Sequence, residues 1–204
     1  MKEFISVPMQ PVHMYPGLIR KGDIEMKEII GEDNFMKLLS NMKEGDYKEE
    51  DFNTVKFFIK NAVIKEVDIE KIEKKISTMW AIKDKDISLR FSDCSIIDTK
   101  ISDSCLDYLT FERCQMNNVK LDHLALAHFC IGNSEEKIYK LILSKSSIEL
   151  LSLTGEDMNY MQESLFENNK IDSLYVDTLD MRCNMAKNNK IRYISKISNV
   201  KRGW

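Results

Sequence analysis

The spacing of apolar residues along the chain changes between residues 82 and 89. Before this point apolar residues recur at steps of three and four, which places them on one face of an α-helix. One such stripe predicts a helix that begins near Asp68, a residue type favoured at helix N-caps. Its members are Ile69, Ile72, Ile76, Met79 and Trp80.

Three further stripes predict helices in the same part of the chain. One follows a run of acidic residues at 49–51, which suits a helix N-terminus, and consists of Phe52, Val55, Phe58 and Ile59. The other two consist of Phe35, Leu38, Leu39 and Met42, and of Ile24, Met26, Ile29 and Ile30. We therefore expect a helical subdomain over residues 23–84. Residues 1–22 contain three prolines, which block regular hydrogen bonding, so we expect an extended or disordered leader there.

From Leu89 onward the period becomes five. Every fifth residue is apolar, in the series Phe91, Ile96, Ile101, Leu106, Phe111, Met116, Leu121, Leu126 and Ile131. The residues two places before these are also apolar or small: Leu89, Cys94, Thr99, Ser104, Leu109, Cys114, Val119, Leu124 and Phe129. The residues two places after them include no aliphatic side chain: Asp93, Asp98, Asp103, Tyr108, Arg113, Asn118, His123, His128 and Asn133. The first two positions should point inward and the third should face water.

This pattern predicts a β-solenoid over residues 85–200. Two residues separated by one point to the same side of a strand, and three further residues must then turn the chain before the next pair. Each five-residue unit is thus one side of a coil, and stacked coils pair their backbones as parallel strands. With the helical subdomain, the fold class is α+β.

The solenoid pattern is interrupted twice. The phase slips near residues 132–138, which predicts a loop. Met158, Met161, Leu165 and Phe166 have helical spacing, which predicts a helical insertion near residues 157–168. The segment from Ile191 to Trp204 fits either a last strand or a capping helix.

The stretch from Leu89 to Ile131 resembles the pentapeptide-repeat family, whose members fold as a right-handed, four-sided β-helix with a large central residue and a small one two places before it. The chain lacks the family's usual Asp or Asn just before the central residue. Leu89, Leu109, Leu124 and Phe129 are larger than the residues that the family prefers two places before it, so distorted or widened coils are expected.

An irregular leucine-rich repeat is the alternative architecture. Leu106, Leu109, Phe111, Cys114 and Met116 fit its signature. The step from Leu109 to Leu124 is shorter than the roughly 20 to 29 residues of a leucine-rich unit, whereas a four-sided coil accommodates it as three sides.

Charge and composition exclude several kinds of partner. The formal net charge is −3 with acidic and basic residues interleaved, which argues against a nucleic-acid-binding face. No apolar run is long enough to cross a bilayer, and the N-terminus lacks the apolar core of a signal peptide, so we expect a cytoplasmic protein without membrane insertion. The five cysteines include no Cys-x-x-Cys pair, which suggests neither disulfides nor a zinc site.

The candidate chemistry is sparse. No phosphate-binding loop, metal-binding His-Glu-x-x-His motif or nucleophile elbow occurs, and we expect no cofactor, metal or catalytic residue. Cys94 and Cys114 are expected to be small core residues. Four-sided stacking should place residues twenty apart next to each other. It therefore pairs Asp93 with Arg113, Tyr108 with His128, and Asp103 with His123, where the carboxylate is expected to favour protonated histidine.

These observations predict a protein-interaction module that binds a partner protein through outward positions. The candidate binding residues are Asp93, Asp98, Asp103, Tyr108, Arg113, Asn118, His123 and His128. The family resemblance implies two roles, a gyrase-binding protein that imitates DNA with outward acidic residues such as Asp93, Asp98 and Asp103, or a bacterial effector secreted into a host cell. The alternatives are an enzyme or toxin with a site where the helical subdomain meets the solenoid, near Trp80 and Phe91, and a structural subunit of a larger assembly.

Overall fold

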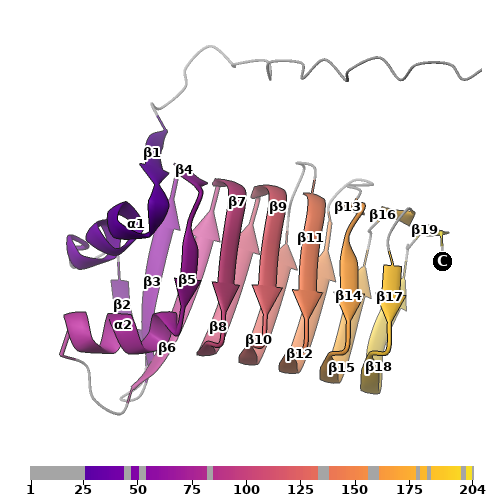
Figure 1. Ribbon diagram of the computed structural model, residues 1–204. Helices are drawn as coiled ribbons and strands as arrows, with labels where there is room; N and C mark the ends of the chain where they lie inside the picture. Colours follow the sequence, from indigo (N-terminus) through magenta and orange to yellow (C-terminus); the bar gives the residue numbers. More distant parts are fainter. Residues whose placement is uncertain are drawn as a thin grey trace, which may run out of the picture.

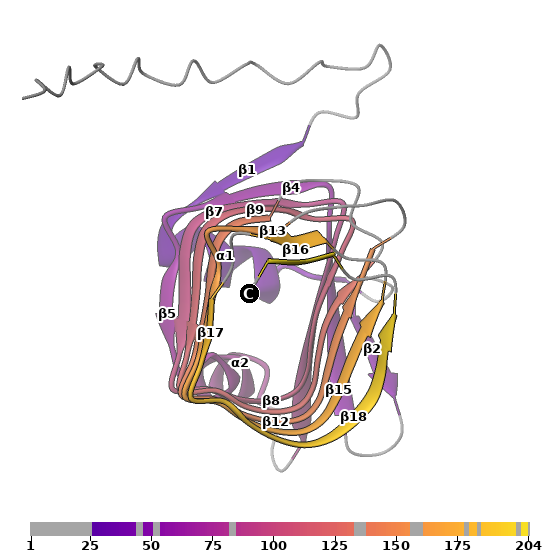
Figure 2. The same cartoon turned by 90° about the vertical axis from the view of Figure 1, so that its right-hand side faces the viewer.

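The structure is a computed structural model in which the chain winds as a parallel β-solenoid (Figures 1 and 2). It describes residues 26–43, 47–50, 54–81, 85–132, 138–155, 161–177, 180–182, 185–198 and 201–203. The predicted leader and the middle of the predicted 132–138 loop lie outside these residues. The solenoid predicted from the five-residue period is confirmed.

Two sheets form the walls of the solenoid, and the chain alternates between them. The first contains β6 (Asp86–Ser92), β8 (Cys105–Glu112), β10 (Ala125–Gly132), β12 (Ser147–Thr154), β15 (Lys170–Asp177) and β18 (Lys190–Ser198). The second contains β7 (Ser95–Ser102), β9 (Gln115–Asp122), β11 (Ile138–Ser144), β13 (Met161–Gln162), β14 (Leu165–Glu167) and β17 (Met185–Lys187). A separate pair joins β16 (Asp180–Arg182) to β19 (Lys201–Gly203).

The strand register confirms the length of the coil. Ile96 pairs with Met116 and Leu106 with Leu126, so each of these coils advances by twenty residues, or four five-residue sides. The next coils are longer, since Leu126 pairs with Ile148 and Ile148 with Ile171. The extra residues fall at the predicted loop and between residues 154 and 161.

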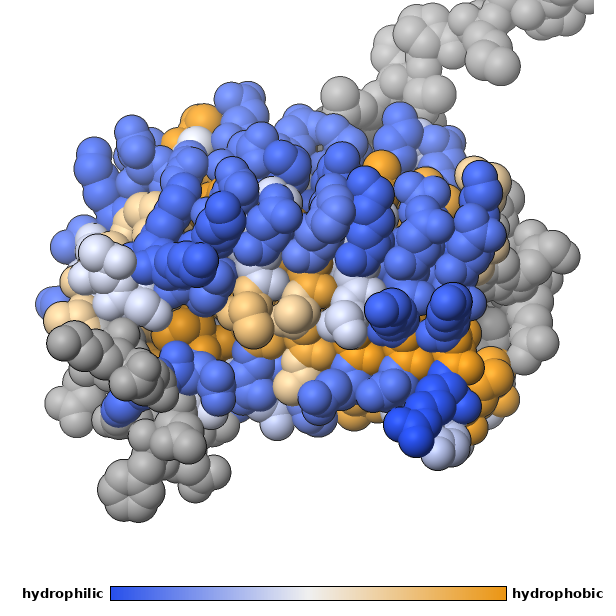
Figure 3. Space-filling view, turned by 60° about the horizontal axis from the view of Figure 1, so that its bottom comes forward, coloured by the Kyte–Doolittle hydropathy of each residue, from blue (hydrophilic) through white to orange (hydrophobic). Residues whose placement is uncertain are grey.

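The two inward positions build one continuous core. All nine central residues from Phe91 to Ile131 are at most 3 % exposed, and Leu109 and Phe129 two places before their central residues are fully buried. The face seen in Figure 3 is mostly polar, with a narrow apolar strip along it. The core therefore extends along the axis, and each coil packs mainly on its two neighbours.

The outward position two places after the central residue is the corner of the coil. Six of the predicted outward residues have φ between 48° and 56°, in the left-handed region: Asp93, Asp98, Asp103, Arg113, Asn118 and His123. At the corner that holds Asp103 and His123, the backbone N–H of each donates to a carbonyl of the next coil, on Asp122 and Ser144. The corner thus turns the chain and also joins successive coils.

The fourth corner of the coil is built differently. Tyr108 and His128 occupy it with negative φ, and their neighbours Leu109 and Phe129 point into the core. These are large side chains at a position that holds Cys94 or Ser104 on other sides of the coil.

The predicted helical subdomain over residues 23–84 is wrong in part. Helices α1 (Gly31–Ser40) and α2 (Ile72–Met79) form, although Asp68 is not the N-cap of α2, because it lies in β5 (Asp68–Glu70) and left-handed Lys71 precedes the helix. The other described elements are strands: β1 (Lys27–Ile30), β2 (Tyr47–Glu50), β3 (Thr54–Lys60) and β4 (Ala62–Lys65). The α+β description therefore holds only for this end of the chain.

Strand β3 replaces the helix predicted from Val55, Phe58 and Ile59. Val55, Phe57 and Ile59 are buried with a period of two, and β3 pairs in parallel with β6. Pairing with β6 satisfies the backbone and buries this row, which outweighs the local helical spacing. Strand β1 likewise replaces the short helix predicted around Ile29, so the solenoid begins before residue 85.

The helices cover the N-terminal end of the solenoid (Figure 1). Phe35 and Leu39 of α1 and Ile72 and Ile76 of α2 are at most 2 % exposed. The Phe35 ring stacks on Phe91 at 6.3 Å between centroids. The cap therefore closes the core of the first coils.

The helical insertion predicted near residues 157–168 is also wrong where the structure describes it. Met161 lies in β13 and Leu165 and Phe166 lie in β14, both of which pair with β11. Met161 and Phe166 are buried in the same columns as the earlier coils. For the end of the chain, either a last strand or a capping helix was expected. Residues 190–198 form a strand.

Inward serines hydrogen-bond backbone groups inside the core. Ser146 is 2 % exposed; its Oγ accepts from Leu124 N at 3.1 Å and donates to Ser144 O at 2.9 Å. Ser164 makes the equivalent bond to Leu141 N at 3.1 Å. These hydroxyls satisfy buried backbone groups near the corners.

Replacing Ser146 by Ala should destabilise the protein by about 1 to 3 kcal/mol, because it leaves the buried Leu124 N–H without an acceptor. Chemical denaturation of the variant measures this loss. Ser147→Ala is the matched control, since Ser147 is the next residue, at the start of β12, and is exposed. It should leave the midpoint unchanged. Equal effects of the two changes would contradict this role of Ser146.

Replacing Lys145 by Val should cost about 1 kcal/mol, because Lys145 has φ of 51° and a β-branched residue is disfavoured in the left-handed region. Lys120→Val provides the comparison at an exposed strand position with negative φ. Unfolding midpoints of both variants test the idea. A smaller loss for Lys145→Val than for Lys120→Val would show that the corner imposes no such constraint.

Candidate interaction surface

The eight predicted binding residues lie on four different corners, two on each. The pairs are Asp93 with Arg113, Asp98 with Asn118, Asp103 with His123, and Tyr108 with His128. Because the corners point in four directions (Figure 2), these residues do not form one binding face. Each pair must be considered with its own surroundings.

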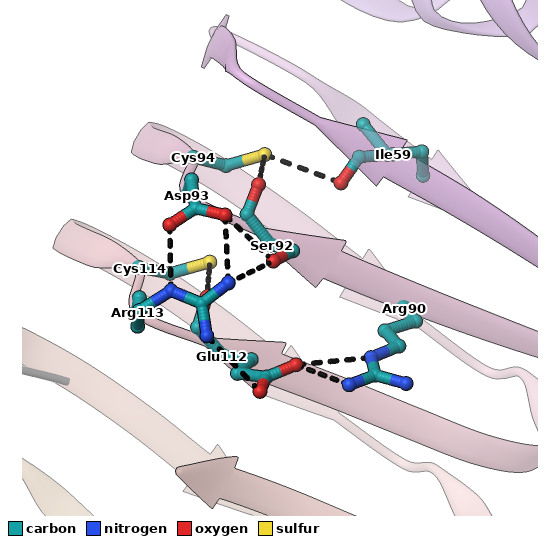
Figure 4. Close-up of polar contacts among 8 residues, drawn as sticks. All are labelled: Ile59, Arg90, Ser92, Asp93, Cys94, Glu112, Arg113 and Cys114. Carbon is teal, nitrogen blue, oxygen red and sulfur yellow. Dashed lines mark hydrogen bonds and ion pairs between the residues drawn. The ribbon is translucent and has the colours of Figure 1, made fainter. Parts of the chain in front are cut away.

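The predicted pair of Asp93 and Arg113 is confirmed and belongs to a larger polar network (Figure 4). Arg113 Nε donates to Asp93 Oδ1 at 2.7 Å, and a terminal nitrogen donates to Oδ2 at 2.9 Å. Glu112 accepts from Arg113 at 3.2 Å and also binds Arg90. Two carboxylates and two guanidinium groups therefore alternate along this edge.

The network sets the charge states of its carboxylates. The hydrogen bond from Arg113 lowers the pKa of Asp93 against the opposing effect of burial. The hydrogen bond from Arg90 lowers the pKa of Glu112 in the same way. Both carboxylates are therefore ionised and already paired with guanidinium groups of the same chain. This corner thus presents no unpaired carboxylate from Asp93 or Glu112 to a partner.

The pairs at the next two corners differ from each other. Asn118 Nδ2 donates to Asp98 Oδ1 at 2.7 Å. His123, however, has its ion pair with its sequence neighbour, since Nδ1 lies 3.1 Å from Asp122 Oδ2. Burial raises the pKa of Asp122, but hydrogen bonds from Ser144 and His123 outweigh it and lower the value. The carboxylate beside His123 is thus Asp122, and the expected Asp103 contact is replaced.

The fourth corner carries a stack of three side chains. The rings of Tyr108 and His128 lie 4.4 Å apart and 19° from parallel, which confirms the predicted pair. Lys56 Nζ lies 5.1 Å from the centroid of the Tyr108 ring, within cation–π range. A pocket of about 70 Å³ beside the stack is lined by Lys56, Ser88, Leu89, Arg90, Tyr108 and Thr110.

This stack begins a wall with aromatic and apolar groups on its outer side, which we call the aromatic face. We define it by a set of half-buried outward side chains of β3, β6, β8, β10, β12 and β15, which leaves out other half-buried residues of these strands such as Thr54 and Asp107. The side chains of the aromatic face are Lys56, Phe58, Arg90, Tyr108, Thr110, His128, Cys130, Leu150, Ser152, Ser173 and Tyr175. The network of Arg113 and Asp93 forms its border.

Sequence reasoning found only part of this face. Tyr108 and His128 were among the predicted residues, whereas Lys56 and Phe58 were missed because their segment was interpreted as a helix. Arg90 and Thr110 occupy the position just before the central residue, and the five-residue period was sufficient to align them. The five-residue period alone does not predict which of the four sides carries aromatic groups.

The junction proposed for an enzyme site is filled by packed side chains. Phe91 stacks on Phe111 at 5.0 Å, and Trp80 lies edge-on to Phe57 at 5.5 Å. A groove of about 260 Å³ lies farther along the N-terminal end, between α1 and β3. Leu38, Met42, Phe58, Lys27 and Lys60 are among its lining residues.

Cys94 and Cys114 have the environment of core residues, whereas Cys105 is exposed and Cys130 is half-buried. Cys94 and Cys114 are 3 % and 1 % exposed, and their thiols donate to Ser92 O at 3.2 Å and Glu112 O at 3.3 Å. The neighbouring Cys94 thiol and burial raise the pKa of Cys114, and burial raises the pKa of Cys130. The Cys114 and Cys130 thiols are therefore protonated, whereas the hydrogen bond with Cys114 lowers the pKa of Cys94. The burial of Cys94 and Cys114 agrees with the small core residues expected there.

No group of His, Cys, Asp and Glu side chains able to hold a metal ion occurs among the residues that the structure describes. No helix in the same part of the chain is long and apolar enough to cross a membrane. No protein-family model, curated protein or solved structure matches the chain. The function must therefore be inferred from the surface itself.

Arg113→Gln should reduce the loss of folding stability that occurs as the pH falls into the acid range. In the folded protein the pKa of Asp93 is lowered, so its contribution is present above the unfolded value of about 3.9 and is lost as the pH falls through the folded value. The variant should melt below the native protein at pH 7, and the difference should shrink in acid. Lys120→Gln, a change at an exposed residue, is the control; a constant difference across pH would contradict the assignment.

Proposed function

We propose that the chain is a protein-interaction module that binds a partner protein through the aromatic face. The observation that carries the proposal is the stack of Lys56, Tyr108 and His128, with a pocket beside it, on a wall of half-buried polar, aromatic and apolar side chains. Tyr and Arg are enriched at the centres of protein interfaces, where rigid aromatic groups are buried at low entropic cost. Tyr108 and Arg90 both line the pocket.

The layout of charges supports a protein partner over imitation of DNA. Asp93, Asp98 and Asp103 lie at three different corners, and the first two are bonded to Arg113 and Asn118. They therefore do not form the continuous acidic row that would imitate a phosphate backbone. Of the two roles implied by the family resemblance, this favours the effector type.

The proposal includes coils of the pentapeptide-repeat type. Support comes from the twenty-residue register, from the two inward columns, and from Cys94, Ser104 and Cys114 at the small position. A leucine-rich unit would add a helix or 3₁₀ turn to each coil. The described residues between 85 and 198 form strands and turns instead.

Site-specific photo-crosslinking in the native cell tests the proposed face. A photoreactive residue at Thr110, within the aromatic face, should give a discrete adduct with one protein, identified by mass spectrometry. The same residue at Asn117, exposed on the opposite sheet, should not. Equal adducts from both positions would place the partner elsewhere.

Tyr108→Ala should then weaken binding of the identified partner by roughly tenfold or more, since truncating an interface aromatic costs about 2 kcal/mol. Asn117→Ala is the matched control and should leave the affinity unchanged. Isothermal titration calorimetry measures both. An unchanged affinity for Tyr108→Ala would remove the aromatic face from the interface.

A further inference from the structure

The last described coil leaves its inward columns uncovered. Ile191, Ile194 and Ile197 of β18 are 41 %, 61 % and 37 % exposed, and Met185 of β17 is 65 % exposed. One coil earlier the residues paired with the first and last of these isoleucines, Ile171 and Val176, are both 4 % exposed. Figure 3 shows apolar side chains gathered toward this end, at its lower right. We call residues 185–187 and 190–198 the open coil.

The open coil is built like an interior coil rather than a terminal one. Terminal repeats of solenoids usually present a polar outer face, because no further repeat covers them. At the other end of this molecule, Leu39 and Ile76 of the helical cap are fully buried on the first coils. The open coil instead places isoleucines at the positions that another layer would cover.

The backbone at this end is also available for pairing. β18 is the last strand of the eight-stranded sheet and pairs with β15, while β17 ends the path of the nine-stranded sheet and pairs with β14. On their outer sides neither has a strand partner among the described elements. An extended peptide can therefore add to β18 by main-chain hydrogen bonds.

The charge of the open coil selects the chemistry of its occupant. Its charged residues are all basic, namely Lys187, Lys190, Arg192 and Lys196, and no acidic residue occurs between positions 185 and 204. Lys196 is paired with Asp177 of the preceding coil. The other three have no carboxylate partner within the described part of the chain. Acidic side chains on an added strand would complement them.

We propose that the open coil binds an acidic β-strand of a partner protein. The strand pairs with β18, its apolar side chains cover Ile191, Ile194 and Ile197, and its carboxylates lie beside Lys190 and Arg192. This site is at the end of the solenoid and is separate from the aromatic face on its side. The binding proposed for the aromatic face and the binding proposed for the open coil can therefore be disproved independently.

Charge argues against a second copy as the occupant. Antiparallel pairing of two β18 strands about Ile194 would place Arg192 opposite Lys196 of the other copy, and like charges directly opposite are destabilising. The chain's own leader is also unsuitable, because its 22 residues contain three prolines and three basic residues against one acidic one. An acidic strand from another protein meets neither objection.

Two synthetic peptides test the proposal against the full-length protein. The first copies β18 (Lys190–Ser198); the second has Glu at its three basic positions and the same apolar residues. Fluorescence anisotropy at low salt should show the acidic peptide binding about tenfold tighter than the copy, and added salt should reduce the difference. Equal affinities, no binding of either, or tighter binding of the copy would overturn the proposal.

Variants of the protein separate charge from apolar contact. The double change K190E and R192E should reverse the preference, so that the basic copy binds better than the acidic peptide. Ile194→Ser should weaken binding of the acidic peptide. Lys120→Glu, at an exposed residue of β9 far from the open coil, should leave this binding unchanged. Sedimentation of the native protein should show a monomer. A dimer that Ile194→Ser dissociates would assign the end to a second copy instead.

Discussion

Pairing between successive coils is the interaction on which the rest of the structure depends. From β6 onward, each coil places its strands in register with those twenty to twenty-three residues away, and the corner at Asp103 and His123 adds a backbone bond to the next coil. This repeated pairing aligns the inward residues in columns and so creates the core. It also stacks the outward residues, which is why Tyr108 lies on His128 and Arg113 reaches Asp93.

The sequence was sufficient to predict the coil but not where the solenoid begins. Between Leu89 and Ile131 the period of five fits neither a helix nor a flat strand, so local pattern and tertiary structure agree there. In Thr54–Lys60 the apolar residues Val55, Phe57, Phe58 and Ile59 fit both a helical stripe and an alternating strand. The choice is made by pairing with β6, a contact with a segment thirty-two residues away, which spacing within the segment does not contain.

The candidate site could be predicted as pairs but not as a face. Residues twenty apart were correctly expected to stack, because that follows from four sides of five residues. Which side carries the aromatic groups depends on the fourth corner, where Tyr108 and His128 keep negative φ and Leu109 and Phe129 are buried in the core. His123 was assigned the wrong carboxylate, because Asp122 lies at the position before the corner and also reaches the imidazole.

The two proposed surfaces differ in whether the backbone of the solenoid is available for pairing. On the side of the solenoid the backbone is already paired, so a partner can be bound only by side chains, and a rigid wall that presents Tyr108, His128 and Lys56 suits this kind of contact. At the end, the outer side of β18 has no strand partner among the described elements and its isoleucines are exposed, so a strand of a partner can extend the sheet. Basic residues on this strand hinder self-pairing, which would otherwise be the simplest way to cover the column. The same charges that keep copies apart therefore make an acidic strand the occupant that the end accepts.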